Sequence, residues 1–342
     1  MAWYHVPGND QDVVICTQVR MARNLAEFPF PARLDASGAR EIITRVGGVL
    51  EKNGFSRTDF EGISRTVAYA LVEKQYASPG FVGESIPHAL FLNEPCNLSV
   101  MVCEEDHIRL QAVYPGLSLR DALDGVSGVE SILDAAFTLA FDGRLGYLTQ
   151  SPAELGTAMR ASVMLCLPML ARGGRIDALS SMLGRMGLSL RAMSDRDHTC
   201  TGTLFRLSAR KTLGVSEEEV VDTLEEAVHR LVDQERRLRT MVSGAELDRL
   251  TDRVRRAEGI LSAAHLLSAD ELLSLHTDVR LGAAMGLLPE VRVESLTALL
   301  IETMPATLTQ AADTEPRDDR ERDLLRARLV RERLSNFHHT GA

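Results

Sequence analysis

The feature that most constrains the fold is a series of short β-type runs between residues 65 and 115. Each run is rich in Val, Leu, Ile, Phe or Tyr, and turn residues such as Pro79 and Gly80 separate the runs. The runs occupy residues 67–72, 89–92, 98–102 and 108–114. Short runs separated by turns are typical of strands that pair with their neighbours in an antiparallel sheet. The sequence therefore predicts an antiparallel meander.

Helical periodicity surrounds these predicted strands. Ser216 and Glu219 form a capping-box signature, which predicts that a long helix begins there. Two further short strands are predicted at 188–190 and 204–208. The other predicted helices are 36–53, 117–140, 157–172, 175–187, 244–265, 268–275 and 293–303.

These patterns predict an α+β fold in two parts. We expect an antiparallel sheet flanked by helices over residues 13–236, followed by an all-helical domain over residues 237–342. The first 35 residues look irregular, apart from a short β-branched run at 13–15. A polar stretch at 311–317 precedes a last, highly charged helix.

Composition and charge exclude several broad classes of protein. The formal net charge is −10, whereas general nucleic-acid binding requires a basic surface. The five cysteines form no C-x-x-C pair, and their odd number argues against a disulfide framework. The longest apolar stretch is too short to span a bilayer, and the N-terminal segment lacks the features of a signal peptide. We therefore expect a cytoplasmic protein that binds neither nucleic acid nor membranes.

The densest group of chemically active side chains lies between two of the predicted strands. It comprises Cys103, Glu104, Glu105, Asp106, His107 and Arg109. One interpretation is a solvated turn, as for most runs of charge. The other is a site in which a carboxylate orients or deprotonates a cationic substrate beside an arginine that binds an anion. His107 has no second metal ligand at helical spacing, so no metal site is predicted.

Arginine supplies the second group of candidates. Arg160 lies near the start of the predicted helix at 157–172, where a helix N-terminus and a guanidinium would together favour a phosphate. The alternative is an ordinary exposed arginine on an amphipathic helix. Arg20, Arg23 and Arg191 are scattered along the chain, and the sequence does not show whether they converge. No P-loop, G-x-G-x-x-G or H-E-x-x-H motif occurs.

Taken together, these segments resemble the bacterial protein arginine kinases of the McsB type, whose catalytic domain is shared with creatine and arginine kinases. Examples are Val-Arg-Met-Ala-Arg-Asn at 19–24 and Glu-Glu-Asp-His-Ile-Arg at 104–109. The other matching segments, in the family's order, are 28–31, 146–149, 155–168, 212–214, 259–261, 278–282 and 322–327. The resemblance implies transfer of the γ-phosphoryl group of ATP, with Mg²⁺ bridging the phosphates, to a guanidinium nitrogen.

The resemblance also implies roles for individual residues. Glu105 would be the carboxylate that aligns and activates the guanidinium, with Glu104 beside it. Arginines of the nucleotide site would hold the phosphates, since phosphoryl transfer depends on positioning and on charge neutralisation. The residues at the family's nucleotide-site positions are Cys16, Thr17, Gln18, Val19, Arg20, Gln75, Arg109, Arg160, Ala161, Ser162, Val163, Met164, Arg191, Ala192, Met193, Ser194, Asp195 and Arg196.

Several positions depart from the family's pattern. They are Gln18 for a phosphate-binding arginine, Gln75 for a histidine, Cys103 for an asparagine, Ser151 for a reactive cysteine and Arg196 for the second substrate carboxylate. Asp195 or Asp197 would replace that carboxylate if the loop shifts by one residue. Three functions stay open: an active protein arginine kinase, a catalytically weakened relative that acts as a phosphoarginine-binding regulatory protein, and a kinase for a free guanidino compound. The helical C-terminal part argues against the third.

The C-terminal part carries a charged motif made of Arg322, Asp323, Arg326 and Ala327. In the family this motif is a receptor for phosphoarginine, and on a helix the two arginines would share one face and could hold an anion. The alternative is a solvated helix with an internal Asp–Arg pair. The resemblance further implies protein substrates that bear arginine, a homodimer formed through the helical part, an adaptor and a protease chaperone.

Overall fold

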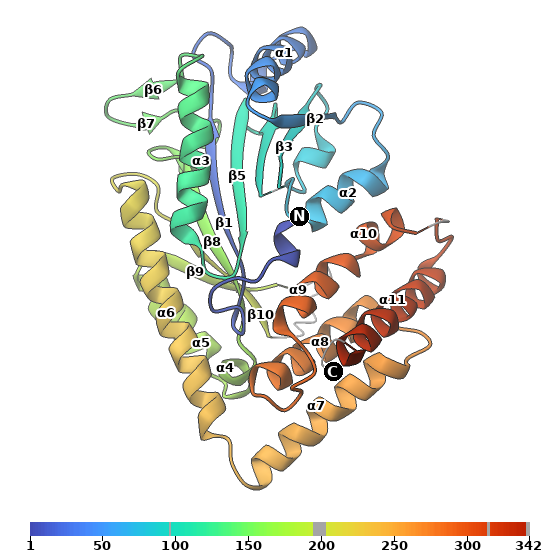
Figure 1. Cartoon of the computed structure of the whole chain (residues 1–342). Helices are drawn as coiled ribbons and strands as arrows, with labels where there is room; N and C mark the ends of the chain where they lie inside the picture. Colours follow the sequence, from blue (N-terminus) through green and yellow to red (C-terminus); the bar gives the residue numbers. More distant parts are fainter. Residues whose placement is uncertain (96, 194–202, 313–314, 340–342) are drawn as a thin grey trace.

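The computed structural model describes residues 1–95, 97–193, 203–312 and 315–339 of the chain. An eight-stranded antiparallel sheet forms its centre, in the order β2-β3-β4-β5-β1-β8-β10-β9 (Figure 1). The strands are β1 (Val14–Arg23), β2 (Phe55–Asp59), β3 (Ala89–Asn93), β4 (Leu98–Val102), β5 (Ile108–Pro115), β8 (Met159–Cys166), β9 (Leu188–Ala192) and β10 (Leu204–Ala209), with a separate hairpin of β6 (Phe141–Asp142) and β7 (Gly146–Tyr147). The predicted antiparallel sheet flanked by helices is confirmed.

Helices cover one face of this sheet. The capping box at Ser216 is confirmed, because its hydroxyl accepts from the Glu219 N–H at 3.1 Å and the Glu219 carboxylate accepts from the Ser216 N–H at 2.9 Å. The helices up to this point of the chain are α1 (Ala36–Lys52), α2 (Arg65–Glu73), α3 (Leu119–Asp134), α4 (Pro168–Arg172), α5 (Ile176–Arg185) and α6 (Glu217–Met241).

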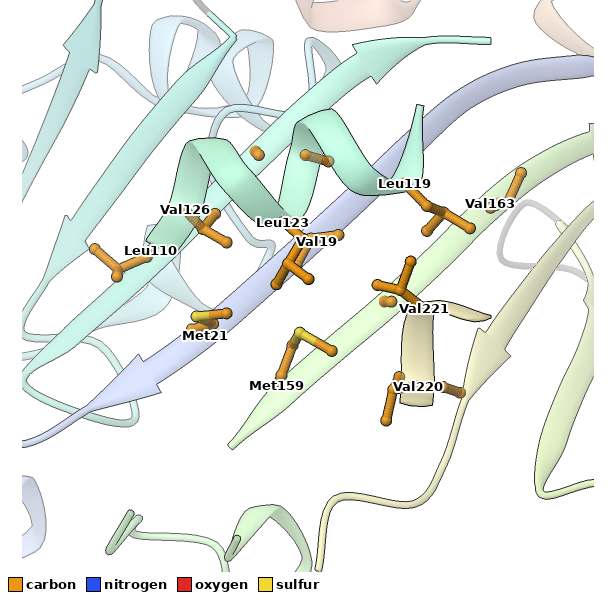
Figure 2. Close-up of a cluster of buried hydrophobic side chains, with 14 of the residues drawn as sticks. Val19, Met21, Leu110, Leu119, Leu123, Val126, Met159, Val163, Val220 and Val221 are labelled. Carbon is orange, nitrogen blue, oxygen red and sulfur yellow. The ribbon is translucent and has the colours of Figure 1, made fainter. Parts of the chain in front are cut away.

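Strand β1 shows how alternation builds the core. Val19 and Met21 are buried and point toward α3 and α6, where they pack in one cluster with Leu123 and Val220 (Figure 2). Burial of an apolar side chain of this size stabilises the fold by about 1.5–3 kcal/mol. Because successive side chains of a strand point to opposite faces, the two residues adjacent to Val19 in the strand face away from the helices. Gln18 and Arg20 therefore lie together on the opposite face of the sheet.

One predicted strand is a helix. Residues 67–72 were expected to extend the meander, but they belong to α2. The Ser64 side chain accepts from the Val67 N–H at 3.3 Å and so caps the first turn. Ala68 and Ala70 of this run are buried on one side of the helix, and alanine is the strongest helix former. The strand prediction was wrong because capping and alanine content outweigh the β-branched residues.

One predicted helix is mainly a strand. Residues 159–166 of the expected helix at 157–172 form β8, and only Pro168 to Arg172 are helical. Strands β1 and β10 pair with both edges of β8, so tertiary pairing decides the conformation. Pro168 opens α4 at a position where its missing N–H costs nothing. The first 35 residues are also less irregular than expected, because β1 is ten residues long and lies inside the sheet.

The C-terminal part is helical, as predicted. Its helices are α7 (Ala245–Ala263), α8 (Ala269–Ala284), α9 (Val293–Glu302), α10 (Pro305–Gln310) and α11 (Asp319–His339). Helices α7, α8, α9 and α11 share an apolar cluster that includes Leu250, Leu272 and Val330. This part also contacts the start of the chain, where Arg280 donates to the Gln11 carbonyl at 2.5 Å. Within the described residues, no helix is both long enough and apolar enough to cross a bilayer.

Candidate active site

Arginines from neighbouring strands point to the sheet face opposite α3 and α6. Their strand neighbours, such as Val19, Leu110, Met159 and Leu207, pack in the helix-covered core, so the arginines project the other way. Register brings them together, because Arg20 lies opposite Arg160 and Arg191 lies opposite Arg206. We call this set the arginine cluster: Arg20, Arg109, Arg160, Arg191 and Arg206.

A small cavity opens between three members of the arginine cluster. Its volume is about 140 Å³. Its lining is Arg20, Met21, Ala22, Arg109, Glu154, Ala158 and Arg160. Three of the arginines that the family resemblance assigned to the phosphates therefore line one cavity. Arg160 reaches it from a strand, and the expected helix N-terminus is not part of the site.

Arg20 carries a positive charge that no acid of the described residues neutralises directly. Burial, together with the positive charges of Arg109 and Arg206, lowers the pKa of its guanidinium to about 10. Among the described residues, no carboxylate oxygen lies within 4.0 Å of the Arg20 guanidinium. A guanidinium that is partly desolvated and surrounded by like charge is stabilised by an anion. The cluster is therefore suited to a polyanionic ligand.

The acidic group after β4 is a tight, buried turn. The Cys103 N–H donates to the His107 carbonyl at 2.8 Å, and the Glu104 N–H donates to the Asp106 carbonyl at 3.1 Å. Cys103 has a φ of +63°, and burial raises the pKa of its thiol to about 12, so it is not a reactive thiolate. Asp106 accepts from the Asn24 amide at 2.7 Å and is fully buried. The interpretation as a fully solvated turn was wrong.

His107 has a structural role in this turn. Its Nδ1 accepts from the Leu25 N–H at 3.1 Å, and its Nε2 lies 2.9 Å from the Pro29 carbonyl, to which it can donate. Burial lowers the pKa of the imidazole, which favours the neutral ring in this arrangement. Both ring nitrogens are thus engaged in tying the turn to the segment after β1.

Arg109 links this turn to the cavity. Its Nη1 lies 2.8 Å from a Glu104 oxygen, and its Nη2 lies 3.3 Å from Glu105 and 3.9 Å from Glu154. Burial lowers the pKa of the Arg109 guanidinium, but the surrounding carboxylates, Glu104 most strongly, raise it overall. Glu104 is buried and also accepts from the Ser78 hydroxyl. Glu105 is 49% exposed, so it is the carboxylate of this group that an incoming substrate can reach.

Glu154 is an acid of the cavity that is absent from the candidates derived from the sequence. It ends the 3₁₀ turn Pro152–Glu154 and is only 7% exposed. One carboxylate oxygen lies 2.5 Å from Arg160 Nε. Gly156, with a φ of +105°, holds the loop in place, since a Cβ there would lie 2.1 Å from the Thr212 carbonyl oxygen. No spacing pattern in the sequence marks Glu154, because its position depends on this close approach.

Arg206 is the second residue that the sequence candidates lack. Its Nη1 donates to Gln18 Oε1 at 3.1 Å and to Ser162 Oγ at 3.2 Å, and its Nη2 donates to Gln75 Oε1 at 3.3 Å. Three expected nucleotide-site residues therefore meet at one guanidinium. The signal that identifies Arg206 is its position between Phe205 and Leu207 in a strand, which turns an arginine to the polar face.

Other expected nucleotide-site side chains do not reach the cavity. Val19, Ala161 and Val163 face the helix-covered core, and the Thr17 hydroxyl donates to the Gly116 carbonyl at 2.7 Å. Cys16 and Met164 share the arginine face but are buried in a separate apolar cluster with Trp3 and Phe81. The alternation of β1 and β8 is the reason, since only every second side chain of a strand can face the ligand.

Arg23 also lies outside the cavity. It is fully buried, forms an ion pair with Glu130 at 2.6 Å, and stacks on the Tyr147 ring at 3.5 Å. Arg191 and Ala192 are exposed at the end of β9, followed by the partly buried Met193. The predicted loop residues Ser194, Asp195 and Arg196, with the alternative Asp197, lie outside the described residues.

The C-terminal motif differs from the expected pair of exposed arginines. Arg326 is 2% exposed, and its guanidinium donates to the Thr303 and Leu267 carbonyls at 3.1 and 2.9 Å and to Asp323 at 2.5 Å. Arg322 is partly exposed and pairs with Asp319 instead. Ala327 is buried beside them. The expectation that both arginines share a free, anion-binding face was wrong, because Arg326 fastens α11 to the ends of neighbouring helices.

The side chains around the cavity fit ATP better than a metal ion bound by the protein. The unneutralised charge of Arg20 matches the phosphates of a nucleotide. No group of three or more His, Cys, Asp or Glu side chains in the described part of the chain is arranged to hold a metal ion. The carboxylates nearest the cavity are paired with Arg109 and Arg160. A Mg²⁺ ion at this site would be carried mainly by the nucleotide phosphates.

Comparisons with known proteins agree with this geometry. Residues 40–238 match the family model "ATP:guanido phosphotransferase, C-terminal catalytic domain", and residues 247–342 match "Protein-arginine kinase McsB C-terminal domain". A protein-arginine kinase of Halalkalibacterium halodurans is 36% identical over 98% of this chain and 96% of its own. One of Symbiobacterium thermophilum is 36% identical over 97% of this chain and 96% of its own.

Solved structures show the same fold at lower sequence identity. The substrate-free duplicated taurocyamine kinase from Schistosoma mansoni has a TM-score of 0.60 and 22% identity over 78% of this chain and 40% of that chain. A lombricine kinase has a TM-score of 0.58 and 19% identity over 67% of this chain and 68% of that chain. These similarities establish the fold alone.

Proposed function

The chain belongs to the protein-arginine kinase family, and on this premise we propose that it transfers the γ-phosphoryl group of ATP to arginine side chains of proteins. One observation carries the proposal. Glu105, which is exposed and can receive a guanidinium, lies 3.3 Å from Arg109, which lines a cavity of arginines that can receive phosphates. The two reactants are thereby brought to one point.

The arginines act on the nucleotide. Arg20, Arg109 and Arg160 surround the phosphates and neutralise the charge that spreads over the transferring group. Mg²⁺ supplies further positive charge when it enters bound to the phosphates. Because Arg20 lacks a carboxylate partner within the described residues, its charge is available to the nucleotide. Glu104 holds Arg109 from the protein side and so fixes its direction.

Glu105 acts on the substrate. Its carboxylate accepts hydrogen bonds from the arginine guanidinium and orients one nitrogen toward the γ-phosphorus. As the nitrogen–phosphorus bond forms, the bond to ADP breaks, and the nitrogen releases a proton to the carboxylate. This chain has Arg196 where the family has its second substrate carboxylate. In this proposal, Asp195 or Asp197 takes over the role of that carboxylate.

The remaining features of the proposal follow the family. The catalytic part spans residues 13–236 and the helical part residues 237–342. The partners are protein substrates that bear arginine, a second copy of the chain, an adaptor and a protease chaperone in a bacterial cytoplasm. Arg322 and Asp323 receive phosphoarginine at the surface of α11, while Arg326 supports the helix from within.

The test is transfer of labelled phosphate from ATP to an arginine-bearing protein, with detection of phosphoarginine. Glu105→Gln is expected to reduce transfer about 10²–10⁴-fold, because it removes the group that takes up the proton. ATP affinity should change little. The matched control is Glu61→Gln, since Glu61 is also exposed and paired with an arginine, Arg40, at 3.0 Å.

The outcomes separate the hypotheses. No transfer by the parent protein in the presence of saturating ATP would support the regulatory, non-catalytic relative. A fully active Glu105→Gln variant would show that another group aligns the substrate. An effect of Glu61→Gln equal to that of Glu105→Gln would show that the loss is not specific to the site.

A further inference from the structure

Within the described residues, Arg206 is held only by neutral groups. Its guanidinium contacts side-chain oxygens of Gln18, Ser162 and Gln75, at 3.1, 3.2 and 3.3 Å. In the described part of the chain, no carboxylate oxygen lies within 4.0 Å of it. Neutral oxygens would be satisfied equally well by a neutral donor such as an amide. The contacts with Gln18, Ser162 and Gln75 therefore do not require the positive charge of Arg206.

The location of Arg206 adds a cost to this charge. Strand β10 lies next to β8, and β8 lies next to β1 (Figure 1). Arg206 reaches Gln18 of β1 across β8, so it shares the polar face with Arg20. After burial, the charges of Arg109 and Arg206 are the next largest causes that lower the pKa of Arg20. Like charges at close range disfavour one another unless an anion lies between them. The nearby acid Glu154 already pairs with Arg160.

The register of the sheet shows where such an anion would lie. Gln18 faces Ser162, two residues along the strands from the pair of Arg20 and Arg160. Two residues of a strand span about 7 Å. Arg206 binds at the Gln18–Ser162 level, whereas Arg109 and Glu105 lie on the β5 side of Arg20. An extended anion that begins beside Arg109 and continues across Arg20 would reach Arg206 with its far end.

We propose that Arg206 is a nucleotide-binding residue that holds the phosphates remaining on ADP after transfer. The inference rests on the proposed function, since it takes the γ-phosphoryl group to lie beside Arg109 and Glu105. Gln18, Gln75 and Ser162 act as positioning residues, because they aim the guanidinium and leave its charge free for the ligand. The site thus obtains from β10 a cation that position 18 of β1, a glutamine, does not supply.

Calorimetry with ATP and with ADP tests the assignment. Arg206→Gln should weaken both nucleotides about 10–100-fold, as for loss of one charged hydrogen-bonding partner. The matched control is Arg120→Gln, which removes the same charge from the exposed surface of α3 on the opposite side of the sheet. The Arg120→Gln variant should bind ATP and ADP with the same affinities as the parent protein. In transfer assays, the Arg206 variant should show a larger rise in KM for ATP than fall in kcat.

A double variant that exchanges the residues at positions 18 and 206 tests whether the loss of ATP affinity is due to charge or to a structural change. Gln18→Arg combined with Arg206→Gln moves the guanidinium across one existing contact, and should recover most of the lost affinity. Gln18→Arg alone should not tighten binding, because it places two guanidinium groups at the same oxygens. Recovery by the double variant would support the inference.

The inference and the proposed function fail in different ways. If the parent binds ATP and Arg206→Gln binds it within threefold, Arg206 is not a phosphate ligand, and the proposed function is unaffected. If Arg206→Gln lowers the unfolding midpoint and the double variant restores neither stability nor affinity, the residue is structural and the inference is overturned. If the parent itself binds no ATP at millimolar concentration, the proposed function fails first.

Discussion

Replacing Glu154 with glutamine is expected to tighten ATP binding about tenfold. The Glu154 carboxylate lies 2.5 Å from Arg160 Nε and 3.9 Å from Arg109 Nη2, at the wall of the cavity proposed for phosphates. It therefore neutralises two of the arginines that a nucleotide needs. An incoming phosphate must compete with it for the same donors, because each guanidinium presents a fixed fork of N–H groups.

The magnitude follows from Coulomb's law. A carboxylate and a phosphate oxygen about 5 Å apart repel by about 3 kcal/mol at an effective dielectric of 20. Arg160 is 47% exposed, so solvent and salt reduce this repulsion to about half of that value. A gain of about 1.4 kcal/mol corresponds to tenfold tighter binding. Glutamine keeps the size of the side chain and removes only the charge.

The same change is expected to destabilise the nucleotide-free protein. Without the Glu154 charge, Arg160 and Arg109 lose part of their compensation, which costs about 1–3 kcal/mol. Saturating ATP should restore much of this loss, so the shift of the unfolding midpoint on adding ATP should be larger for the variant than for the parent. Glu302→Gln is the control, since Glu302 pairs with the half-exposed Arg333 at 2.9 Å, away from the cavity.

Calorimetry and thermal unfolding, each with and without ATP, decide the matter. Weaker ATP binding by a folded Glu154→Gln variant would refute the reasoning, since it would mean that Glu154 positions Arg160 for the phosphates instead of competing with them. An equal change in Glu302→Gln would assign the effect to general charge.

Two further predictions concern the helical part. Arg326→Ala should lower the free energy of unfolding by about 3–5 kcal/mol, because it removes a buried guanidinium with three partners, whereas Arg322→Ala should change it by less than about 0.5 kcal/mol and test phosphoarginine binding cleanly by calorimetry. Burial and Arg280 lower the pKa of His276 to about 4, so its stabilising effect is present above about pH 6.5 and is lost as the pH falls toward 4. His276→Gln should flatten this part of the stability–pH curve measured by urea unfolding, and an unchanged slope would assign the acid sensitivity to other groups.

Local pattern was enough to predict much of the fold. The strands at 89–92, 98–102 and 108–114 were predicted from β-type runs between turns, and the helix after Ser216 from its capping box. These elements are specified by residues close in the chain. Strand β8 was not, because its conformation depends on pairing with β1 and β10, which are remote in sequence. A local pattern cannot reveal a partner that the chain reaches only after folding.

The candidate site shows the same division. The acidic turn around Glu105 is contiguous, so the sequence displays it as a group. Glu154 and Arg206 are brought in by the fold: one by the close approach of Gly156 to Thr212, the other by the register between β8 and β10. Glu154 and Arg206 thus come from separate segments of the chain, and no fixed spacing in the sequence marks them as parts of one site.

The alternation of β1 makes the site and the core inseparable. Val19 and Met21 are buried under the helices (Figure 2) only if Gln18 and Arg20 lie on the other face of the sheet, since neighbouring side chains of a strand point to opposite faces. A slip of one residue against β8 would bury a guanidinium among apolar side chains and expose Val19, at a cost far above the stability of a typical domain. The apolar packing of β1 therefore fixes the face of the sheet on which Arg20 lies.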